Sequence, residues 1–427
     1  MKTILLFGAG KSATVLIDYL VQLGEGGSHK IVIADVNKEQ ILNKTNHSAF
    51  ADAVAIDIHD AGQRAMLIGS ADIVISLMPP ALHFLVAQDC VKLGKNLLTA
   101  SYIDSAIKDL QPEIEQKGLL FICEMGLDPG IDHMSAMKII DHIHQNHGII
   151  TSFKSHCGGL VAPESDDNPW HYKISWNPRN VVMAGKAGAE YKEDGKIVHK
   201  NYQELFSECK TVNVDGLSPL ACYPNRDSLS YIPVYHLPEV QTFIRTTLRY
   251  PAYCIGWNAI VHSGLADETR TVATSGLTFR KWSEPILPYL QSQNKEMLSY
   301  LGLMEDHAIP AHAQTSADIL QYLLETKLVM QPEDKDMIVM LHEIEYTQEQ
   351  KKYKVNSELV VNGEDYLRTA MAKTVGLPLG IAATLILDGT ITMTGLQIPT
   401  DERIYTPVLK ELEKNGIQFR ETVEDLS

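Results

Sequence analysis

The first 125 residues alternate between short apolar runs and stretches in which apolar residues recur at helical spacing. The runs predict six buried strands, at residues 3–7, 31–34, 54–56, 73–77, 96–99 and 119–123. Between them, stretches such as 12–23 and 81–93 place apolar residues three and four positions apart, which predicts helices. Strands that alternate with helices in this way indicate a parallel sheet with helices on both faces.

The pattern changes near Gly126, beyond which the segments are longer and less regular. Several apolar stretches alternate with polar residues, as half-buried antiparallel strands do. The candidate strands in this part are 153–156, 196–199, 271–275 and 337–346. Helix-like apolar patterns return at 366–387 and 406–415.

These patterns predict an α/β fold class with two sheets of different kinds. We expect a Rossmann-type parallel-sheet domain over 1–125 and a second, α+β domain with an antiparallel sheet over 126–365. We expect the remaining helical segment, 366–427, to pack back on the first domain.

Composition changes this picture little, but charge limits the partners. Of 427 residues, 45% are hydrophobic and 21% are charged, which is ordinary for a globular chain. The formal charge of −16 argues against nucleic-acid binding, because neutralising phosphates needs a basic face. The six cysteines form no CxxC pair, so we expect neither a disulfide framework nor a metal site. We also expect no membrane segment and a cytoplasmic location, because no cleavable leader and no run of about 18 uninterrupted apolar residues is present.

A glycine-rich turn joins the first predicted strand to the first predicted helix. It fits the pattern GxGxxA and comprises Gly8, Ala9, Gly10, Lys11, Ser12 and Ala13. In this motif the first glycine permits the tight turn, the second lets the backbone approach a pyrophosphate, and the small third residue lets helix and strand pack closely. The turn lies between a buried strand and a helix, as the motif requires, so we predict a dinucleotide site here.

Two acids end the next strands. Asp35 follows the second strand, where a carboxylate accepts hydrogen bonds from both ribose hydroxyls and repels a 2′-phosphate. This favours NAD over NADP, although Lys38 lies close enough in sequence to complicate the inference. Asp57 ends the third strand and is either a neighbour of the adenine or a solvated loop acid.

Ligands of open α/β sheets bind beyond the carboxyl ends of the strands. Three such ends carry candidate chemistry: 76–80, 101–102 and 124–133. The last contains Asp128, which is either a catalytic acid or a turn-forming residue, since Asp-Pro-Gly is itself a turn signal. The second domain has three notable cations, Arg226, Arg245 and Arg249. Arginine forks bind carboxylates bidentately, but these side chains could equally be ordinary ion-pair partners.

Longer runs of sequence resemble the saccharopine dehydrogenases of the glutamate-forming type, also called saccharopine reductases. The most specific runs are Gly-Leu-Asp-Pro-Gly-Ile-Asp-His at 126–133 and Cys-Gly-Gly-Leu-Val-Ala-Pro-Glu at 157–164. Further matches are Ala-Ser-Tyr at 100–102, Tyr-Pro-Asn-Arg-Asp-Ser at 223–228 and Thr-Leu-Arg-Tyr at 247–250. The resemblance runs essentially from end to end. It implies a Rossmann domain, a substrate and dimerisation domain, and a C-terminal segment that returns to the first domain.

The resemblance also implies the reaction, in which saccharopine, NAD(P)⁺ and water are interconverted with glutamate and 2-aminoadipate 6-semialdehyde. Matched motif by motif, it assigns saccharopine to Ser101, Tyr102, Asp128, Arg226, Thr247, Leu248 and Arg249. It assigns the cofactor to the glycine turn, Asp35, Ser76, Leu77 and Met78. Fungal relatives that use NADP tend to have a basic residue in place of Asp35, which again favours NAD.

The implied chemistry explains these residue types. Hydride leaves the carbon beside the secondary amine and water attacks the resulting imine, so protons must move at the amine, the water and the leaving nitrogen. Asp128 is the predicted proton-transfer group or the orienter of the amine, with Tyr102 as a hydrogen-bonding helper. Cys157 is a weaker acid–base candidate, for which a buried thiol is the alternative. Arg226 and Arg249 would clamp carboxylates, so we expect a positive pocket in an acidic protein, and a homodimer as in the family.

Two other functions stay open at this point. One is a dehydrogenase of the same fold that acts on another secondary amine, such as carboxynorspermidine dehydrogenase or lysine 6-dehydrogenase. Its substrate would carry fewer carboxylates, and the two arginines argue against it. The other is a non-catalytic NAD-binding sensor or scaffold, against which the polar residues at the strand ends argue.

Overall fold

The computed structural model describes residues 1–427 as two compact units. Unit 1 comprises Met1–His142 and Leu367–Gln418, and unit 2 comprises Ile143–Tyr366 and Phe419–Ser427. The division differs from the predicted boundaries in two places. The turn and most of the helix that follow Gly126 belong to unit 1, because they are bonded to the ends of its sheet. The last nine residues belong to unit 2, because they add a strand to its sheet.

Unit 1 contains a seven-stranded sheet in the order β16-β6-β5-β4-β1-β2-β3, in which all neighbours are parallel. The strands are β1 (Lys2–Phe7), β2 (His29–Asp35), β3 (Ala51–Ala55), β4 (Ile73–Ser76), β5 (Asn96–Thr99), β6 (Leu120–Ile122) and β16 (Gly395–Gln397). Six of them overlap the predicted apolar runs, although β3 begins three residues before the predicted strand at 54–56, and the predicted Rossmann-type sheet is confirmed. The seventh, β16, comes from the C-terminal part of the chain and pairs with β6.

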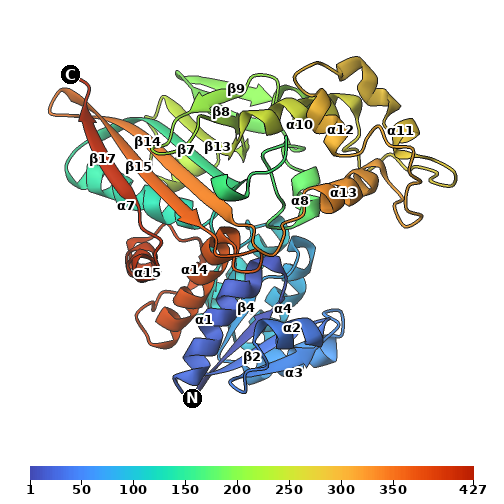
Figure 1. The fold of residues 1–427 in the computed structure, drawn as a ribbon. Helices are drawn as coiled ribbons and strands as arrows, with labels where there is room; N and C mark the ends of the chain where they lie inside the picture. Colours follow the sequence, from blue (N-terminus) through green and yellow to red (C-terminus); the bar gives the residue numbers. More distant parts are fainter. The chain divides into compact units, whose positions relative to one another are not determined.

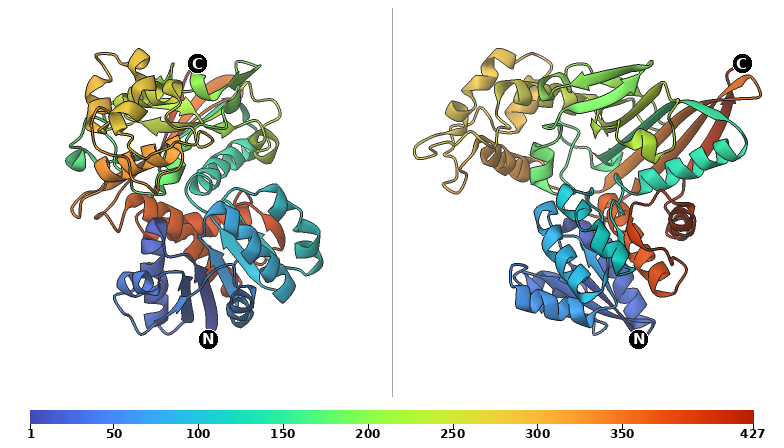
Figure 2. Two further views of the ribbon diagram at one scale, coloured as in Figure 1. Left: turned by 90° about the vertical axis from the view of Figure 1, so that its right-hand side faces the viewer. Right: turned by 180° about the vertical axis from the view of Figure 1, so that it is seen from behind.

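Helices flank both faces of this sheet (Figure 2). They are η1 (Lys11–Ala13), α1 (Thr14–Glu25), α2 (Lys38–Lys44), α3 (Ala61–Ser70), η2 (Pro80–Leu82), α4 (His83–Leu93), α5 (Ser105–Lys108), α6 (Gln111–Gln116), α7 (Ile131–Gln145), α14 (Ala370–Leu387) and α15 (Glu402–Lys414). Side chains of the strands, such as Leu5, Phe7 and Val74, are almost completely buried in one core cluster. Asp60 and Asp104 begin α3 and α5 by accepting hydrogen bonds from main-chain N–H groups in the first turn.

The helix α14 is long and apolar enough to cross a membrane by length and composition alone. In the structure 61% of this apolar window is buried inside the protein, and α14 packs side by side with α1 (Figure 1). Such burial is what a core helix requires. The long apolar pattern at the C-terminal end therefore serves the packing of unit 1.

Unit 2 is built on a ten-stranded mixed sheet with the path β10-β11-β13-β7-β14-β15-β17. Its longest strands are β7 (Ile149–Val161), β14 (Asp336–Gln348) and β15 (Lys351–Asn362), which Figure 1 shows side by side. Most neighbours are antiparallel, but β13 runs parallel to β7. The other strands are β8 (Ala189–Glu193), β9 (Lys196–Lys200), β10 (Lys210–Val212), β11 (Leu220–Pro224), β12 (Arg226–Asp227), β13 (Thr242–Arg249) and β17 (Arg420–Asp425).

The rest of unit 2 is helical and packs on a second core cluster that includes Trp170, Tyr253 and Trp257. The helices are η3 (Pro163–Ser165), α8 (Pro178–Val182), η4 (Tyr202–Glu204), α9 (Tyr231–Val234), α10 (Pro251–Ser263), α11 (Phe279–Trp282), η5 (Glu284–Tyr289), α12 (Lys295–Tyr300) and α13 (Ser316–Lys327). The predicted strand at 271–275 is wrong. Thr271 makes a single isolated bridge with Thr315, and without a neighbouring strand the residues that follow it form no regular secondary structure.

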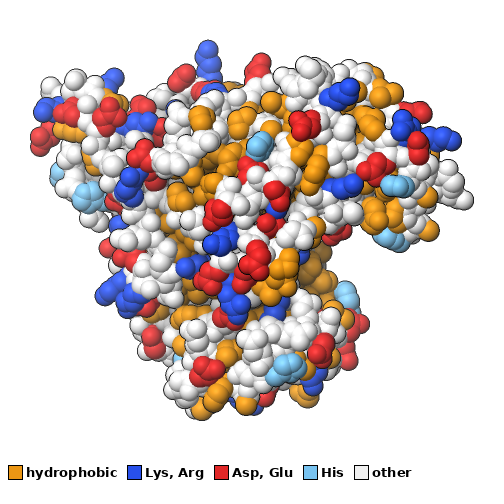
Figure 3. All heavy atoms as spheres, viewed as in Figure 1, with side chains coloured by type: hydrophobic (Ala, Val, Ile, Leu, Met, Phe, Trp, Pro, Cys, Tyr) orange, Lys and Arg blue, Asp and Glu red, His pale blue; other side chains and the backbone are white.

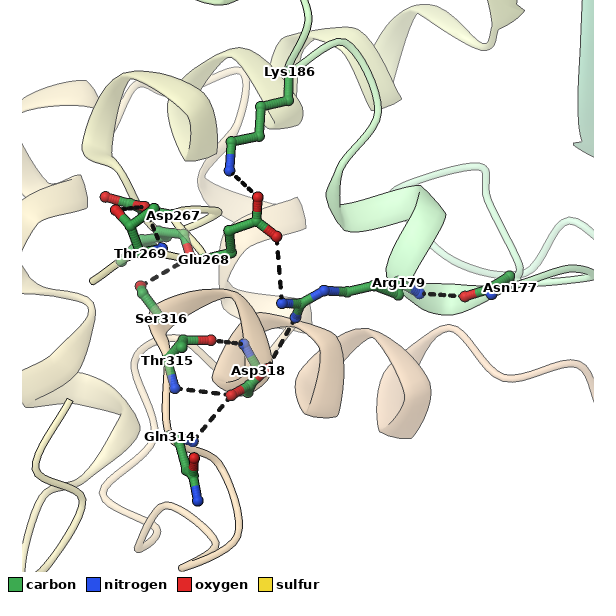
Figure 4. Close-up of polar contacts among 11 residues, drawn as sticks. Asn177, Arg179, Lys186, Asp267, Glu268, Thr269, Gln314, Thr315, Ser316 and Asp318 are labelled. Atoms are coloured by element: carbon green, nitrogen blue, oxygen red, sulfur yellow. Dashed lines mark hydrogen bonds and ion pairs between the residues drawn. The ribbon is translucent and has the colours of Figure 1, made fainter. Parts of the chain in front are cut away.

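Charged side chains join three segments of this helical part (Figure 4). Arg179, in α8, lies 2.9 Å from Asp318 of α13 and 3.7 Å from Glu268. Glu268 also pairs with Lys186. Because all four side chains are about one-third exposed or more, each pair contributes little on its own, about 0–1 kcal/mol.

Candidate active site

The glycine turn lies between β1 and η1 at the end of the parallel sheet. Gly8 has a φ of +98°, and a Cβ there would lie 2.8 Å from the carbonyl oxygen of Leu77, so the position requires glycine. A Cβ on Gly10 would meet nothing within 4 Å, which leaves the backbone open to an approaching group. The turn therefore fits the pyrophosphate of a dinucleotide, as the sequence motif predicts.

The Asp35 carboxylate is bonded to the same turn. Its Oδ2 accepts a hydrogen bond from the N–H of Ala9 at 2.7 Å, and its Oδ1 accepts one from the N–H of Asn37 at 3.0 Å. Both oxygens thus hold the main chain. Asp57 is exposed and accepts a hydrogen bond from the N–H of His59 at 3.0 Å, so it holds its own loop, while a role beside the adenine stays a prediction.

Two side chains of α2 donate hydrogen bonds to the carbonyl groups of the turn. The sequence patterns did not identify them. Gln40 donates to the carbonyl of Ala9 at 2.6 Å. The Nζ of Lys44 donates to the carbonyl of Gly10 at 2.6 Å and to the hydroxyl of Thr14 at 2.7 Å. Burial lowers the pKa of Lys44 to about 8, against the opposing effect of Asp35 and Asp18. These contacts fix the carbonyls so that the turn keeps one shape.

The strand-end residues predicted for the cofactor lie next to this turn. Leu77 donates its N–H to the carbonyl of Phe7 at 2.9 Å, and its own carbonyl is the neighbour of Gly8 described above. Ser76 is fully buried, whereas Leu77 and Met78 are partly exposed. The structure thus brings the glycine turn and residues 76–78 together.

Ser101 is joined to Ser76 through a residue that the sequence patterns missed, His83. The Nδ1 of His83 lies 2.8 Å from the hydroxyl of Ser76, and its Nε2 lies 2.8 Å from that of Ser101. A single histidine at the start of a largely apolar helix gives no clear signal by itself. The available signal was its position, because α4 begins directly after the candidate strand end at 76–80.

The turn that carries Asp128 is tightly built. The N–H of Gly126 donates to the carbonyl of Pro129, and the N–H of Gly130 donates to Oδ1 of Asp132 at 2.6 Å. Gly130 has a φ of +145°, and a Cβ there would lie 2.1 Å from the carbonyl oxygen of Gly126, so no other residue fits. Asp128 is partly exposed while the rest of the turn is buried. Its carboxylate is therefore the polar group that this rigid turn presents.

Hydrogen bonds attach this turn to the end of β5. The N–H of Met125 donates to the carbonyl of Thr99, and the N–H of Glu124 donates to that of Ser101, both at 3.0 Å. The buried carboxylate of Glu124 lies 3.0 Å from Nε2 of His133. Ser101 and the Asp128 turn are thus held together by main-chain hydrogen bonds within unit 1. Tyr102 is the next residue after Ser101.

In unit 2 the sheet places two other predicted residues opposite each other. Cys157 in β7 is paired in register with Thr247 in β13, and its side chain is buried. On the other side of β13, Tyr223 of β11 is the neighbour of Thr247. Leu248 is buried in the apolar cluster on the sheet, so it contributes its main chain at most.

Arg249 ends β13 and is 4% exposed. Its Nη1 donates to the carbonyl of Leu248 at 2.7 Å, and its guanidinium carbon lies 5.3 Å from the ring centres of both Tyr172 and Tyr253. No carboxylate pairs with it, and its Nε and the hydroxyl of Tyr253 are buried without a hydrogen-bond partner. A buried cation is costly unless it is paired. The residues around Arg249 therefore form a ready site for an anion.

The other two arginines differ from Arg249. Arg226 is exposed and has a φ of +51°, just beyond the end of β11. Arg245 is buried in β13, with its guanidinium carbon 4.5 Å from the ring centre of Tyr231. The predicted substrate residues are thus divided in the chain, with Ser101, Tyr102 and Asp128 in unit 1 and Cys157, Arg226, Thr247, Leu248 and Arg249 in unit 2.

The charged side chains of the protein surface are of both signs. Acidic and basic side chains are interspersed on the face shown in Figure 3, and acids outnumber bases by 53 to 37 in the whole chain. A positive site is therefore a local property of Arg249 and its immediate surroundings.

Comparison with known proteins gives a consistent result over the whole length. Residues 126–417 match the family model of the saccharopine dehydrogenase C-terminal domain, and residues 4–122 match that of the saccharopine dehydrogenase NADP binding domain. The chain is 34% identical to saccharopine dehydrogenase [NADP(+), L-glutamate-forming] of Saccharomyces cerevisiae, over 98% of this chain and 99% of the yeast protein. It is 34% identical to the mitochondrial alpha-aminoadipic semialdehyde synthase of Bos taurus, but spans only 47% of that longer protein.

Solved structures give the same result. The apo saccharopine dehydrogenase (L-Glu forming) from Saccharomyces cerevisiae matches with a TM-score of 0.90 and 31% identity, over 99% of this chain and 100% of the yeast chain. The homospermidine synthase of Legionella pneumophila matches with a TM-score of 0.58 at 9% identity, covering 100% of this chain and 92% of that one. The second likeness shows a shared fold.

The prediction that NAD is favoured over NADP is wrong. The matching domain is an NADP binding domain, and the yeast relative is named for NADP(+). The prediction treated Asp35 as a ribose acceptor, whereas both of its oxygens hold main-chain N–H groups of Ala9 and Asn37. A carboxylate that braces the turn in this way is a poor indicator of which nucleotide binds.

The fold, the glycine turn, the Asp128 turn and the comparisons agree over the whole length of the chain. A family model matches more than half of it, and a relative at 34% identity is covered almost completely. The chain belongs to the saccharopine dehydrogenase family.

Proposed function

We propose that this protein oxidises saccharopine with NADP⁺ and water to glutamate and 2-aminoadipate 6-semialdehyde, and catalyses the reverse reaction. The observation that carries the proposal is Arg249, a buried guanidinium without a carboxylate partner. Saccharopine has three carboxylates, and arginine binds carboxylates through two parallel hydrogen bonds. A substrate with more amines and fewer carboxylates would leave this cation uncompensated.

The protein residues would bind the substrate and move its protons. Arg249 would bind one carboxylate, and the exposed Arg226 would bind another. Asp128 stands on a turn that its neighbours hold rigidly, so its carboxylate is suited to take a proton from the secondary amine or to orient it. Ser101 and Tyr102 would hydrogen-bond the substrate. When bound, NADP⁺ accepts the hydride.

The cofactor would be held by unit 1. The backbone of Gly8–Ala13 would receive the pyrophosphate, and residues 76–78 would lie beside the nicotinamide half. Lys11 precedes Asp35 in the chain and Lys38 follows it, and both lysines are exposed. They are the cations that would bind a 2′-phosphate. Cys157 is a buried thiol of the sheet and is proposed only as a neighbour of the substrate.

We further propose that the enzyme is a homodimer, as the resemblance implies, and that it is cytoplasmic, as the sequence patterns predict. Light scattering coupled to gel filtration tests the dimer directly. A mass of one chain, near 47.4 kDa, at assay concentration would contradict it.

The activity is tested with purified protein, saccharopine and either NADP⁺ or NAD⁺, by following the absorbance of the reduced nicotinamide. We expect turnover with saccharopine and a higher kcat/KM with NADP⁺. Turnover of carboxynorspermidine or of lysine, without turnover of saccharopine, would replace the proposal with the corresponding amine dehydrogenase. Absence of turnover with all three substrates would contradict it outright.

A further inference from the structure

His83 occupies a central position at the end of the parallel sheet. It is the first residue of α4, and it is 4% exposed. Its Nδ1 contacts the hydroxyl of Ser76, which ends β4, while its Nε2 contacts the hydroxyl of Ser101 and, at 3.3 Å, that of Thr99, which ends β5. One imidazole thus connects the ends of two neighbouring strands.

The imidazole of His83 is held in its neutral form. Burial lowers its pKa to about 4, and the carboxylate of Asp104 opposes this with a smaller effect. All three groups that contact the ring are hydroxyls, and none is a carboxylate. At neutral pH one ring nitrogen therefore carries a hydrogen and the other accepts one.

A neutral imidazole between two hydroxyls fixes the direction of both. If Nε2–H donates to Ser101, then Nδ1 accepts the hydrogen of Ser76, and the hydroxyl hydrogen of Ser101 is left to point at a ligand. If the tautomer is reversed, both hydroxyls reverse with it. The main chain restrains the same groups, because the N–H of Ser101 donates to the hydroxyl of Thr99 at 3.2 Å.

We propose that His83 is a positioning residue of the reaction: it turns the hydroxyl hydrogen of Ser101 toward saccharopine, and by accepting the hydrogen of Ser76 it leaves the oxygen of Ser76 as a hydrogen-bond acceptor for the cofactor. This rests on the proposed function, since Ser101 and Ser76 are the residues assigned there to substrate and cofactor. The tautomer with Nε2–H is the productive one, because it lets Ser101 donate a hydrogen bond to a substrate carboxylate. His83 itself touches neither ligand in this assignment.

The test compares His83→Ala, Ser101→Ala and the double variant with the wild-type enzyme. The loss of one oriented hydrogen bond predicts a rise in the KM for saccharopine of about tenfold in each single variant. Because both act through the same hydroxyl, the double variant should be no worse than Ser101→Ala. His83→Gln, which can place an amide N–H near the former Nε2, should recover part of the loss. Independent, multiplicative effects in the double variant would overturn the proposal.

A matched control separates positioning from the mere stability of α4. Asp89 lies in the same helix, is equally buried, and bonds to Arg64 at 2.7 Å without contacting either serine. Asp89→Asn should lower the melting temperature and leave the KM for saccharopine within twofold of wild type. An equal rise in KM in Asp89→Asn and His83→Ala would overturn the proposal.

Two further measurements do not depend on saccharopine turnover. Titration of NADPH, followed by its fluorescence, should give a weaker Kd in Ser76→Ala and in His83→Ala, with no further weakening in the double variant. The imidazole ¹⁵N shifts of His83 should report one neutral tautomer from pH 8 to about 5. If the enzyme fails to oxidise saccharopine, the proposed function fails, and these measurements still decide the role of His83. Additive Kd changes or a protonated ring at pH 6 would overturn it.

Discussion

Two of the arginines in unit 2, Arg179 and Arg249, differ in whether carboxylates lie beside them. Arg179 lies among carboxylates, 2.9 Å from Asp318 and 3.7 Å from Glu268, and a third of its side chain is exposed (Figure 4). Arg249 is buried beside the rings of Tyr172 and Tyr253 and has no carboxylate partner. The first ties helices together, whereas the second is arranged as a binding site would be. The two residues differ in the side chains that surround them, and the residue type alone does not show which side chains these are.

This comparison separates stability from binding. A paired arginine that is one-third exposed contributes a little to stability and nothing to the binding of an anionic ligand, because its charge is already compensated. A buried arginine without a partner lowers stability through its lost hydration, and it recovers that free energy when an anion binds. Substitution of the two residues should therefore produce opposite results in the same two measurements.

The largest effect is expected for Arg249→Met. Removing one member of a buried charge pair in a complex costs about 2–5 kcal/mol, so the KM for saccharopine should rise about 100-fold or more. The free energy of unfolding should stay equal or increase, because a desolvated cation is replaced by an apolar side chain of similar length. Steady-state kinetics and denaturant unfolding measure both. A variant that is markedly less stable and binds saccharopine normally would reverse the interpretation of this site.

A paired carboxylate in the sheet extends the comparison to pH. Glu343 in β14 accepts a hydrogen bond from Nε2 of His156 at 3.1 Å, and it pairs with Lys354. The bond from His156, together with Lys354, outweighs burial and lowers the pKa of Glu343 from 4.5 to about 2. A lowered carboxylate pKa stabilises the folded state above pH 4.5, and this contribution is lost as the pH falls from 4.5 toward 2.

We therefore expect Glu343→Gln to be less stable than wild type at pH 7, by about 2 kcal/mol. The difference should narrow as the pH is lowered from 4.5 toward 2. Glu345→Gln, in the same strand, is the control and should show a small, constant difference. Melting temperatures across this pH range measure both, and a gap that widens in acid would show that the pairing of Glu343 does not stabilise the fold.

Arg179→Met should have a smaller effect, and this effect should be on stability and not on substrate binding. We expect the free energy of unfolding to fall by about 1 kcal/mol, and the loss to shrink in 1 M salt as the ion pairs are screened. The KM for saccharopine should stay unchanged. The two variants are measured in the same assay. An increase in the KM of Arg179→Met would show that the two arginines do not differ in their role in substrate binding.

The smallest effect on stability is expected for Tyr253→Phe. The hydroxyl of Tyr253 is buried without a hydrogen-bond partner, so its removal should leave stability unchanged or raise it slightly. If the hydroxyl donates to the same anion as Arg249, the KM for saccharopine should rise by about threefold to tenfold. An unchanged KM would restrict the anion site to the guanidinium.

The parallel sheet could be predicted from the sequence because most of its first six strands contain a short, continuous apolar run. Neighbouring residues such as Leu5 and Leu6 point to opposite faces of the sheet and both are buried, so no polar alternation interrupts the apolar run. The strand β16 could not be predicted. It is three residues long, and only pairing with β6, some 270 residues earlier, makes it a strand.

The mixed sheet was harder to predict for the same physical reason. Its strands β8, β10 and β12 are short and polar, and their structure comes from neighbours that are distant in sequence. At the candidate site, the glycine turn and the Asp128 turn could be predicted, because their backbone conformations require glycine or proline and these residues are visible in the sequence. The roles of His83, Lys44 and Asp35 depend on which atoms the fold brings within 3 Å, which no local pattern records.

The C-terminal part of the chain completes both sheets, since β16 adds an edge to one and β17 to the other. During translation a ribosome that has reached residue 390 has made every other strand of both units. Until the last 40 or so residues emerge, β6 and β15 each present an unpaired edge with free main-chain hydrogen-bonding groups. Premature termination before residue 395 would therefore yield a chain with two unpaired edges, and termination between 398 and 419 a chain with one, at β15. We expect such products to aggregate or to be recognised by chaperones.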